Sequence, residues 1–185
     1  MRVISGQWRG RKLMSPKGDR VRPTTDRVKE ALFSILGPKV RGSVVLDLCC
    51  GAGGLAIEAL SRGAVRAVLV DNHRKSLELA RRNLELCGAE PGRFELVCSE
   101  AETFFHSWSP PNDRQPWILL CDPPYHLSLA QAMVQRVMRE APARSMVAAI
   151  IEHNNADAVP EFQDEHWQLQ NRSYGETVLS VLRPA

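Results

Sequence analysis

The sequence contains no apolar run that approaches the roughly 18 residues needed for a membrane-spanning helix. It also lacks internal repeats, low-complexity tracts and the apolar segment of an N-terminal secretory signal. The five cysteines are odd in number and include no C-x-x-C pair, which disfavours a disulfide framework and a zinc site. We therefore expect a cytoplasmic protein with buried free thiols, no bound metal and no association with a membrane.

The composition is that of an ordinary globular domain. Of the 185 residues, 44% are hydrophobic and 24% are charged, which suits a single folded core. The charge is uneven, because residues 1–29 hold nine basic and two acidic residues, a local net charge of +7. The whole chain carries +3, so the remainder carries −4. A basic arm on an acidic body favours a polyanion partner, above all nucleic acid, although a solvated terminal surface has the same composition.

Strand and helix patterns alternate after residue 43. The predicted strands are apolar and lie at 43–48, 66–70, 94–98, 117–121 and 146–152. The predicted helices lie at 26–36, 55–62, 73–87, 101–105 and 127–140. We expect a closing antiparallel hairpin at 167–173 and 177–183, and two short strands within 1–22 that lie on the body or on a ligand. This order predicts an α/β fold with a doubly wound, mostly parallel sheet, which binds ligands at the carboxyl ends of its strands.

Three of the predicted strand ends carry residues suited to a nucleotide-like ligand. Gly51 and Gly53 follow the first strand together with Asp47, and glycines let a ligand approach the backbone, although a tight turn alone also needs them. Asp71 ends the second strand, where a carboxylate accepts hydrogen bonds from ribose hydroxyls or caps the next helix. Glu100 and Ala101 follow the third strand, where they suit an adenine or simply begin a short helix.

The fourth strand ends in Asp122, Pro123, Pro124 and Tyr125. Each proline fixes its backbone and lacks an N–H group, so the segment is stiff and presents acceptors, namely the Asp122 carboxylate and the Pro123 carbonyl. Tyr125 adds a flat ring on which a base can stack. Acceptors beside a stacking ring predict a receptor for the exocyclic amine of a planar heterocycle.

These motifs together resemble a known enzyme family. The glycine turn and the Asp-Pro-Pro-Tyr segment are similar to the signature of class I S-adenosylmethionine-dependent amino-methyltransferases. Residues 6–13, 22–33, 58–64 and 174–177 narrow the resemblance to the bacterial 16S ribosomal RNA guanine-N2 methyltransferases of the RsmD type. The match extends over nearly the whole chain.

The resemblance implies a Rossmann-like sheet of about seven strands in residues 23–185 and a basic, RNA-facing hairpin in residues 1–22. Asp47, Gly51 and Gly53 would surround the methionine part of the cofactor, Asp71 the ribose, and Glu100 with Ala101 the adenine. The resemblance assigns a further cofactor-side motif to Thr24, Thr25 and Arg27, the target guanine to Asp122, Pro123, Pro124 and Tyr125, and RNA phosphates to Arg9, Arg11, Lys12, Arg20 and Arg22. Cys49, Cys50 and Glu100 depart from the residues usual in the family.

The implied reaction is methylation of a guanine N2 amine in 16S ribosomal RNA, on a small-subunit particle. We expect a monomer, because the sequence has no obvious extra apolar element. Adenine also has an exocyclic amine, so an N6-adenine methyltransferase acting on DNA or RNA is the first alternative. The second alternative is a catalytically silent RNA-binding protein of ribosome assembly. Protein glutamine methylation is disfavoured because that family usually has Asn-Pro-Pro-Tyr, and nothing in a nicotinamide dehydrogenase explains Asp122-Pro123-Pro124-Tyr125.

Overall fold

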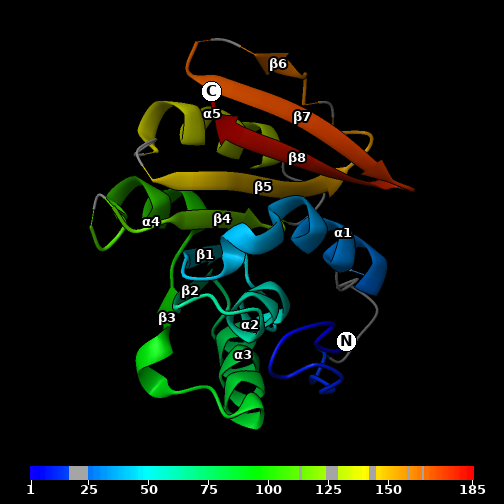
Figure 1. Cartoon of the computed structure of the whole chain (residues 1–185), viewed down its shortest axis with the longest axis vertical. Helices are drawn as coiled ribbons and strands as arrows, with labels where there is room; N and C mark the ends of the chain where they lie inside the picture. Colours follow the sequence, from blue (N-terminus) through cyan, green and yellow to red (C-terminus); the bar gives the residue numbers. More distant parts are fainter. Residues whose placement is uncertain (17–24, 113, 124–128, 142–144, 158, 164) are drawn as a thin grey trace.

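Eight strands form one sheet in the order β3-β2-β1-β4-β5-β8-β7-β6 (Figure 1). The computed structural model describes residues 1–16, 25–112, 114–123, 129–141, 145–157, 159–163 and 165–185. The strands are β1 (Val44–Leu48), β2 (Arg66–Asp71), β3 (Phe94–Cys98), β4 (Trp117–Cys121), β5 (Met146–Asn154), β6 (Phe162–Gln163), β7 (Trp167–Tyr174) and β8 (Thr177–Pro184). Strands β1 to β5 pair in parallel, whereas β8, β7 and β6 add to β5 as antiparallel neighbours.

The predicted α/β class and the antiparallel C-terminal hairpin are confirmed. The strand count differs from the expected seven, because β6 adds a two-residue edge strand that pairs with β7 through Phe162 and Leu169. So short a segment carries no hydrophobic period, and the sequence therefore gives no sign of it. Strands β1 and β4 are buried along their whole length, which explains their continuous apolar sequences.

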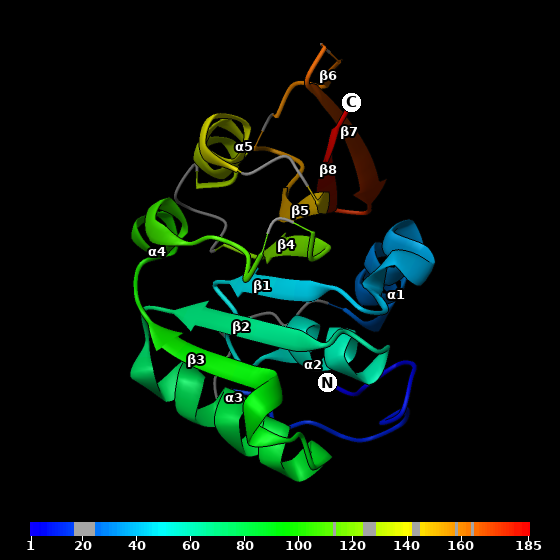
Figure 2. The ribbon, with the colours of Figure 1, turned by 60° about the vertical axis from the view of Figure 1, so that its left-hand side comes forward.

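Helices cover both faces of the sheet (Figure 2). They are α1 (Asp26–Leu36), α2 (Gly54–Ser61), α3 (Arg74–Cys87), α4 (Ala101–Ser107) and α5 (Leu129–Glu140), with 3₁₀ helices η1 (Gly37–Val40) and η2 (Pro91–Arg93). Apolar residues of α1, α2 and α3 share one core cluster, and those of α4 and α5 share the other. Thr25 caps α1, since its hydroxyl accepts a hydrogen bond from the Val28 amide at 3.3 Å.

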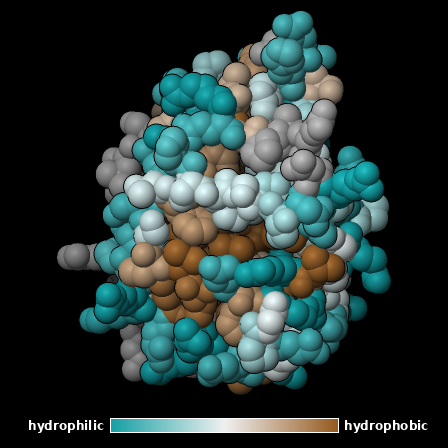
Figure 3. Space-filling model, turned by 90° about the vertical axis from the view of Figure 1, so that its left-hand side faces the viewer, coloured by the Kyte–Doolittle hydropathy of each residue, from teal (hydrophilic) through white to brown (hydrophobic). Residues whose placement is uncertain are grey.

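Strand β3 is the edge of the parallel part of the sheet and is only half buried. The side of the molecule on which α4 lies shows an apolar area framed by polar residues (Figure 3).

All five cysteines are free, as expected, but Cys98 at the end of β3 is exposed and Cys49 is half-buried. The expectation of buried thiols is therefore wrong at these two positions.

The N-terminal arm, residues 1–16, covers the outer side of α2. Helix α2 has seven buried residues in eight, so the sheet alone does not enclose it. Val3 and Leu13 of the arm enter the core cluster that α2 shares with α1 and α3. The arm lies on the body, as predicted, but its expected strands reduce to one isolated antiparallel bridge between Arg2 and Lys12. Residues 17–22 lie outside the described residues.

Candidate cofactor and substrate site

The strand register brings the predicted site segments to one edge of the sheet. Leu48, the last residue of β1, pairs with Val70 of β2 and with Cys121 of β4. Asp71 in turn pairs with Cys98, the last residue of β3. The segments that follow β1, β2, β3 and β4 therefore begin side by side, as a parallel sheet requires.

The glycine turn, residues 49–53, has an unusual backbone. Cys49, Gly51 and Gly53 all have positive φ angles, of 58°, 52° and 79°. A Cβ atom on Gly53 would lie 3.0 Å from a Leu69 methyl group and 3.2 Å from the Ala80 Cβ, so packing requires glycine there. Among the residues that the structure describes, none would lie within 4 Å of a Cβ on Gly51, so open space adjoins its backbone there. Gly53 thus shapes the turn, while Gly51 leaves room for a ligand.

Asp71 faces this turn. The Gly51 amide donates to its Oδ2 at 2.9 Å, and the His73 amide donates to its Oδ1 at 2.8 Å. The second bond ties Asp71 to His73, the N-cap residue of α3, and not to an amide of the first helical turn. Each carboxylate oxygen has a further lone pair, and Asp71 therefore retains the capacity to accept two hydroxyl groups.

Asp47 is buried beneath the turn, with its Oδ2 accepting the Ala56 amide at 3.0 Å. Burial raises the pKa of Asp47 to about 8, and the negative charges of Asp122 and Asp71 contribute to the increase. Three carboxyl groups therefore lie close enough to influence one another at this edge. Such a site favours a ligand that carries positive charge.

Asp122 is half-buried, and its amide donates to the Leu48 carbonyl at 3.4 Å, directly before the glycine turn. Pro123 is buried beside it. Pro124 and Tyr125 lie outside the described residues. The structure thus places the first half of the predicted amine receptor next to the predicted cofactor turn.

Glu100 is exposed and accepts a hydrogen bond from the Asn72 side chain at 3.0 Å. It occupies the N-cap position of α4, whose first residue, Ala101, is buried. The Thr25 hydroxyl caps α1, and Arg27 is exposed. Within the described residues, neither side chain makes a hydrogen bond or ion pair with the glycine turn. Thr24 lies outside the described residues.

Comparison with known proteins decides the family. A family model described as "Conserved hypothetical protein 95" matches residues 1–183. The chain belongs to this family, the RsmD family of class I S-adenosylmethionine-dependent methyltransferases.

Relatives with assigned names agree. The chain is 32% identical over 183 residues to the putative rRNA methyltransferase YlbH of Bacillus subtilis, covering 99% of this chain and 98% of that protein. It is 38% identical over 134 residues to ribosomal RNA small subunit methyltransferase D of Escherichia coli, an alignment covering 72% of this chain and 65% of that protein. The solved structure of the putative methyltransferase yhhF of E. coli matches with a TM-score of 0.79 and 30% identity, covering 100% of this chain and 97% of that one.

S-adenosylmethionine is the cofactor of the RsmD family, and the described residues suit it. The open space beside Gly51 admits the cofactor to the backbone. The spare lone pairs of Asp71 suit a ribose diol. The buried Asp47, with its raised pKa, suits the cationic methionine part, because a nearby positive charge offsets the penalty of ionising a buried carboxyl group. Cys50, which departs from the family pattern, is buried, and burial raises the pKa of its thiol, so it remains uncharged.

The predicted RNA-binding residues of this RsmD family member occupy the arm. Arg9, Arg11 and Lys12 are exposed, and the Arg11 guanidinium donates to the Leu86 carbonyl on α3. Arg20 and Arg22 lie outside the described residues. In the part of the chain that the structure describes, no helix is both long and apolar enough to cross a bilayer.

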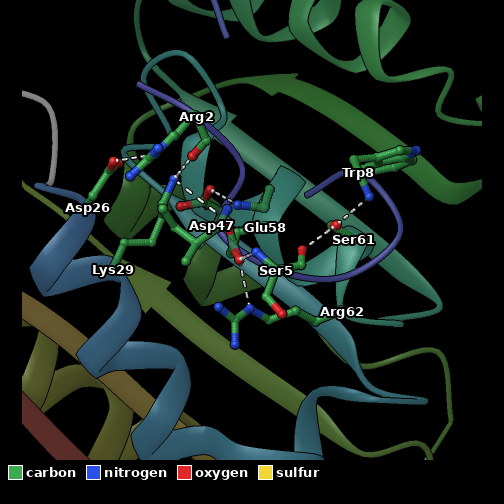
Figure 4. Close-up of polar contacts among 11 residues, drawn as sticks. Arg2, Ser5, Trp8, Asp26, Lys29, Asp47, Glu58, Ser61 and Arg62 are labelled. Atoms are coloured by element: carbon green, nitrogen blue, oxygen red, sulfur yellow. Dashed lines mark hydrogen bonds and ion pairs between the residues drawn. The ribbon is translucent and has the colours of Figure 1, made fainter. Parts of the chain in front are cut away.

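A buried ionic cluster anchors the arm, and sequence reasoning missed it (Figure 4). Glu58 of α2 accepts the amides of Ile4 and Ser5 at 2.7 and 2.9 Å, and the Arg62 guanidinium at 2.8 Å. Lys29 of α1 lies 3.7 Å from Glu58 and donates to the Arg2 carbonyl. One signal existed, because the helical period places Lys29 on the apolar side of α1, and a lysine there requires a buried acceptor.

Proposed function

We propose that this protein transfers a methyl group from S-adenosylmethionine to the exocyclic N2 amine of a guanine in 16S ribosomal RNA. The observation that carries the proposal is the position of Asp122 and Pro123 directly beside the glycine turn, at the carboxyl end of β4. Ribosomal RNA as the acceptor is supported by relatives named ribosomal RNA small subunit methyltransferase D. The choice of guanine N2 rests on the motif resemblance.

We propose that different residues along this edge of the sheet bind different parts of the cofactor. Asp47, Gly51 and Gly53 hold the methionine part, Asp71 holds the ribose, and Glu100 with the Ala101 backbone meets the adenine. The further cofactor-side residues are Thr24, Thr25 and Arg27. The open space at Gly51 supports the assignment of the methionine part, and the lone pairs of Asp71 support that of the ribose.

S-adenosylmethionine supplies a methyl group that its sulfonium already activates. The protein's task is to activate the amine, whose lone pair is delocalised into the guanine ring. The Asp122 carboxylate and the Pro123 carbonyl accept the two N–H groups, which localises the lone pair on N2. The same oxygens stabilise the positive charge that develops there, and Asp122 accepts the proton that is released. Pro124 and Tyr125 complete the receptor, with Tyr125 stacking on the base.

We propose that residues 1–22 form the RNA-facing extension of a methyltransferase domain made of residues 23–185. Arg9, Arg11, Lys12, Arg20 and Arg22 contact phosphates, which makes affinity dependent on salt. The substrate is a small-subunit particle, and the enzyme acts on it as a monomer. Because that substrate is cytoplasmic, we propose that the enzyme is cytoplasmic too. The exposure of Arg9 and Lys12 supports the phosphate contacts.

The identity of the methylated nucleoside tests the proposal. The protein is incubated with tritiated S-adenosylmethionine and with 16S RNA or small subunits from a strain that lacks the activity. The RNA is then digested to nucleosides, and we expect label in N2-methylguanosine. Label in N6-methyladenosine would replace guanine by adenine as the substrate. Failure to bind the cofactor at all would favour the silent RNA-binding alternative.

A further inference from the structure

Asn83 is a fully buried polar residue on α3 that the proposed reaction does not use. Its side-chain NH₂ group donates to the Met14 carbonyl at 3.0 Å and to the Ala52 carbonyl at 3.0 Å. Its Oδ1 accepts the Met14 amide at 2.8 Å. Met14 belongs to the arm, and Ala52 belongs to the glycine turn, so one side chain joins the two segments.

We infer that Asn83 is a positioning residue that couples RNA binding on the arm to cofactor binding on the glycine turn. The inference rests on the proposed function, which assigns RNA to the arm and S-adenosylmethionine to the turn. The three partners define the chemistry needed at position 83. Two carbonyls require two donors and one amide requires an acceptor, a combination that a carboxamide provides and a carboxylate does not.

The hydrogen bond to Ala52 fixes the shape of the turn. It holds the Ala52 carbonyl toward α3, while the Gly53 amide of the same peptide donates back to the Cys50 carbonyl at 2.8 Å. Both ends of the Ala52–Gly53 peptide are thus held, next to the open backbone of Gly51. Movement of Asn83 therefore shifts the segment on which the cofactor binds.

The arm contacts the turn at a second point. A Cβ atom on Gly54, the first residue of α2, would lie 2.6 Å from the Met1 Sδ atom, so the Met1 side chain packs against this glycine. Met1 therefore contacts the segment 52–54 directly, and Met14 reaches it through Asn83. RNA that immobilises the arm also immobilises Asn83 and the turn, and cofactor on the turn does the same for the arm. Coupling between two binding sites is reciprocal, so each ligand strengthens the binding of the other.

Asn83→Asp tests the coupling, because it keeps the size and the acceptor but turns a carboxylate toward the Met14 and Ala52 carbonyls. Titration calorimetry measures the affinity for S-adenosylhomocysteine with and without small ribosomal subunits from a strain that lacks the activity. In the unmodified protein we expect RNA to tighten the cofactor product about fivefold or more, a common size for such coupling. In Asn83→Asp we expect weaker binding without RNA and no tightening when RNA is added. A merely structural role of Asn83 would not change the ratio of the affinities for S-adenosylhomocysteine with and without RNA.

Ser61→Ala is the matched control. It removes the hydroxyl that accepts the Trp8 amide at 3.0 Å and donates to the Ser5 carbonyl at 2.6 Å, so it loosens the arm without touching the turn. We expect it to leave the affinity for S-adenosylhomocysteine unchanged in the absence of RNA. Wild-type affinity and a wild-type RNA effect in Asn83→Asp would overturn the inference. A wild-type protein that does not bind S-adenosylhomocysteine would overturn the proposed function instead.

Hydrogen exchange in the unmodified protein decides the matter if Asn83→Asp does not fold. The Met14 amide bonds to Asn83, so its exchange reports on the arm. The Gly53 amide reports on the turn. We expect saturating S-adenosylhomocysteine to slow exchange at Met14, and 16S RNA to slow exchange at Gly53. Protection confined to the segment that each ligand contacts would refute the coupling.

Discussion

The ammonium of Lys29 and the carboxylate of Glu58 lie 3.7 Å apart, and their side chains are only 2% and 0% exposed. Burial lowers the pKa of Lys29, and the charge of Glu58 opposes this change. Lys29 comes from α1, Glu58 comes from α2, and both bind backbone groups of the arm. The pair is therefore the point at which three segments of the chain are held together.

Replacing one partner of this pair destabilises the fold. Lys29→Met leaves the buried Glu58 with Arg62 as its remaining cation, and we expect the free energy of unfolding to fall by about 3 kcal/mol. Urea unfolding measures the change. The control is Arg82→Met, which breaks the exposed pair with Glu78 and is expected to change stability by no more than about 0.5 kcal/mol. Equal effects of the two substitutions would contradict the role given to Lys29.

Two glycines of the arm share a backbone conformation and differ in their surroundings. Gly6 and Gly10 have φ angles of 85° and 82°. A Cβ on Gly6 would overlap the Ser61 carbonyl, whereas a Cβ on Gly10 would meet nothing within 4 Å. We expect Gly10→Ala to cost about 1–2 kcal/mol from backbone strain alone. Gly6→Ala should cost clearly more and release the arm, which limited proteolysis of residues 1–16 detects.

Ionisation of Asp47 makes stability depend on pH. The pKa of this group rises from 3.8 to about 8 on folding, so between these values the native state keeps a proton that the unfolded state has lost. The contribution of Asp47 to stability therefore falls as pH rises from about 4 to about 8. We expect Asp47→Asn, which retains an acceptor for the Ala56 amide, to gain stability relative to the wild type over this range. Denaturant unfolding at several pH values measures the difference, and a difference independent of pH would rule out the raised pKa.

Asp122 should affect turnover without affecting cofactor binding. Asp122→Ala removes the acceptor that stabilises charge developing on the amine, and we expect single-turnover methyl transfer to fall by about 10²–10³-fold. Affinity for S-adenosylhomocysteine should stay within about twofold, as judged by calorimetry. Glu165→Gln, an exposed change in the C-terminal part of the chain, serves as the control. Near-normal turnover in Asp122→Ala would remove Asp122 from the mechanism.

The basic residues of the arm should set the salt dependence of RNA binding. Loss of two phosphate contacts in Arg9→Ala/Arg11→Ala is expected to reduce the slope of log K against log salt by about 1.4. Arg66→Ala is the control, because the Arg66 charge is already paired with Glu95 at 2.7 Å. Filter binding over a range of salt concentrations gives both slopes. If the double variant keeps the wild-type slope, RNA does not contact the arm at these residues.

Much of the fold follows from local sequence patterns. Strands β1, β2 and β4 are where the hydrophobic pattern predicts them, because strands buried on both faces have continuous apolar sequences. The parallel register then brings the residues after each strand to one edge. The position of the candidate site was therefore predictable once the class of sheet was known.

The arm and its anchors were not predictable in the same way. Its contacts with Glu58 and Asn83 join residues far apart in the chain, and the backbone of 1–16 follows α2 and α3 rather than its own pattern. The sequence around Glu58 is that of an ordinary charged position on a helix. The sequence around Asn83 is that of a surface position on α3. Only tertiary packing shows that both are buried and occupied.

The order in which the chain is synthesised affects when the arm can dock on its partners. Its hydrogen bonds to α2 and α3 reach partners 53 to 75 positions later, whereas those to α1 reach partners only 24 to 27 positions later. A nascent chain that has not yet produced α3 thus lacks the partners of Arg11 and Met14, and loops of this length close only after the helices that receive them have formed. The arm is therefore secured in full only after α3 has formed, and until then part of this positively charged segment stays detached from a half-finished sheet.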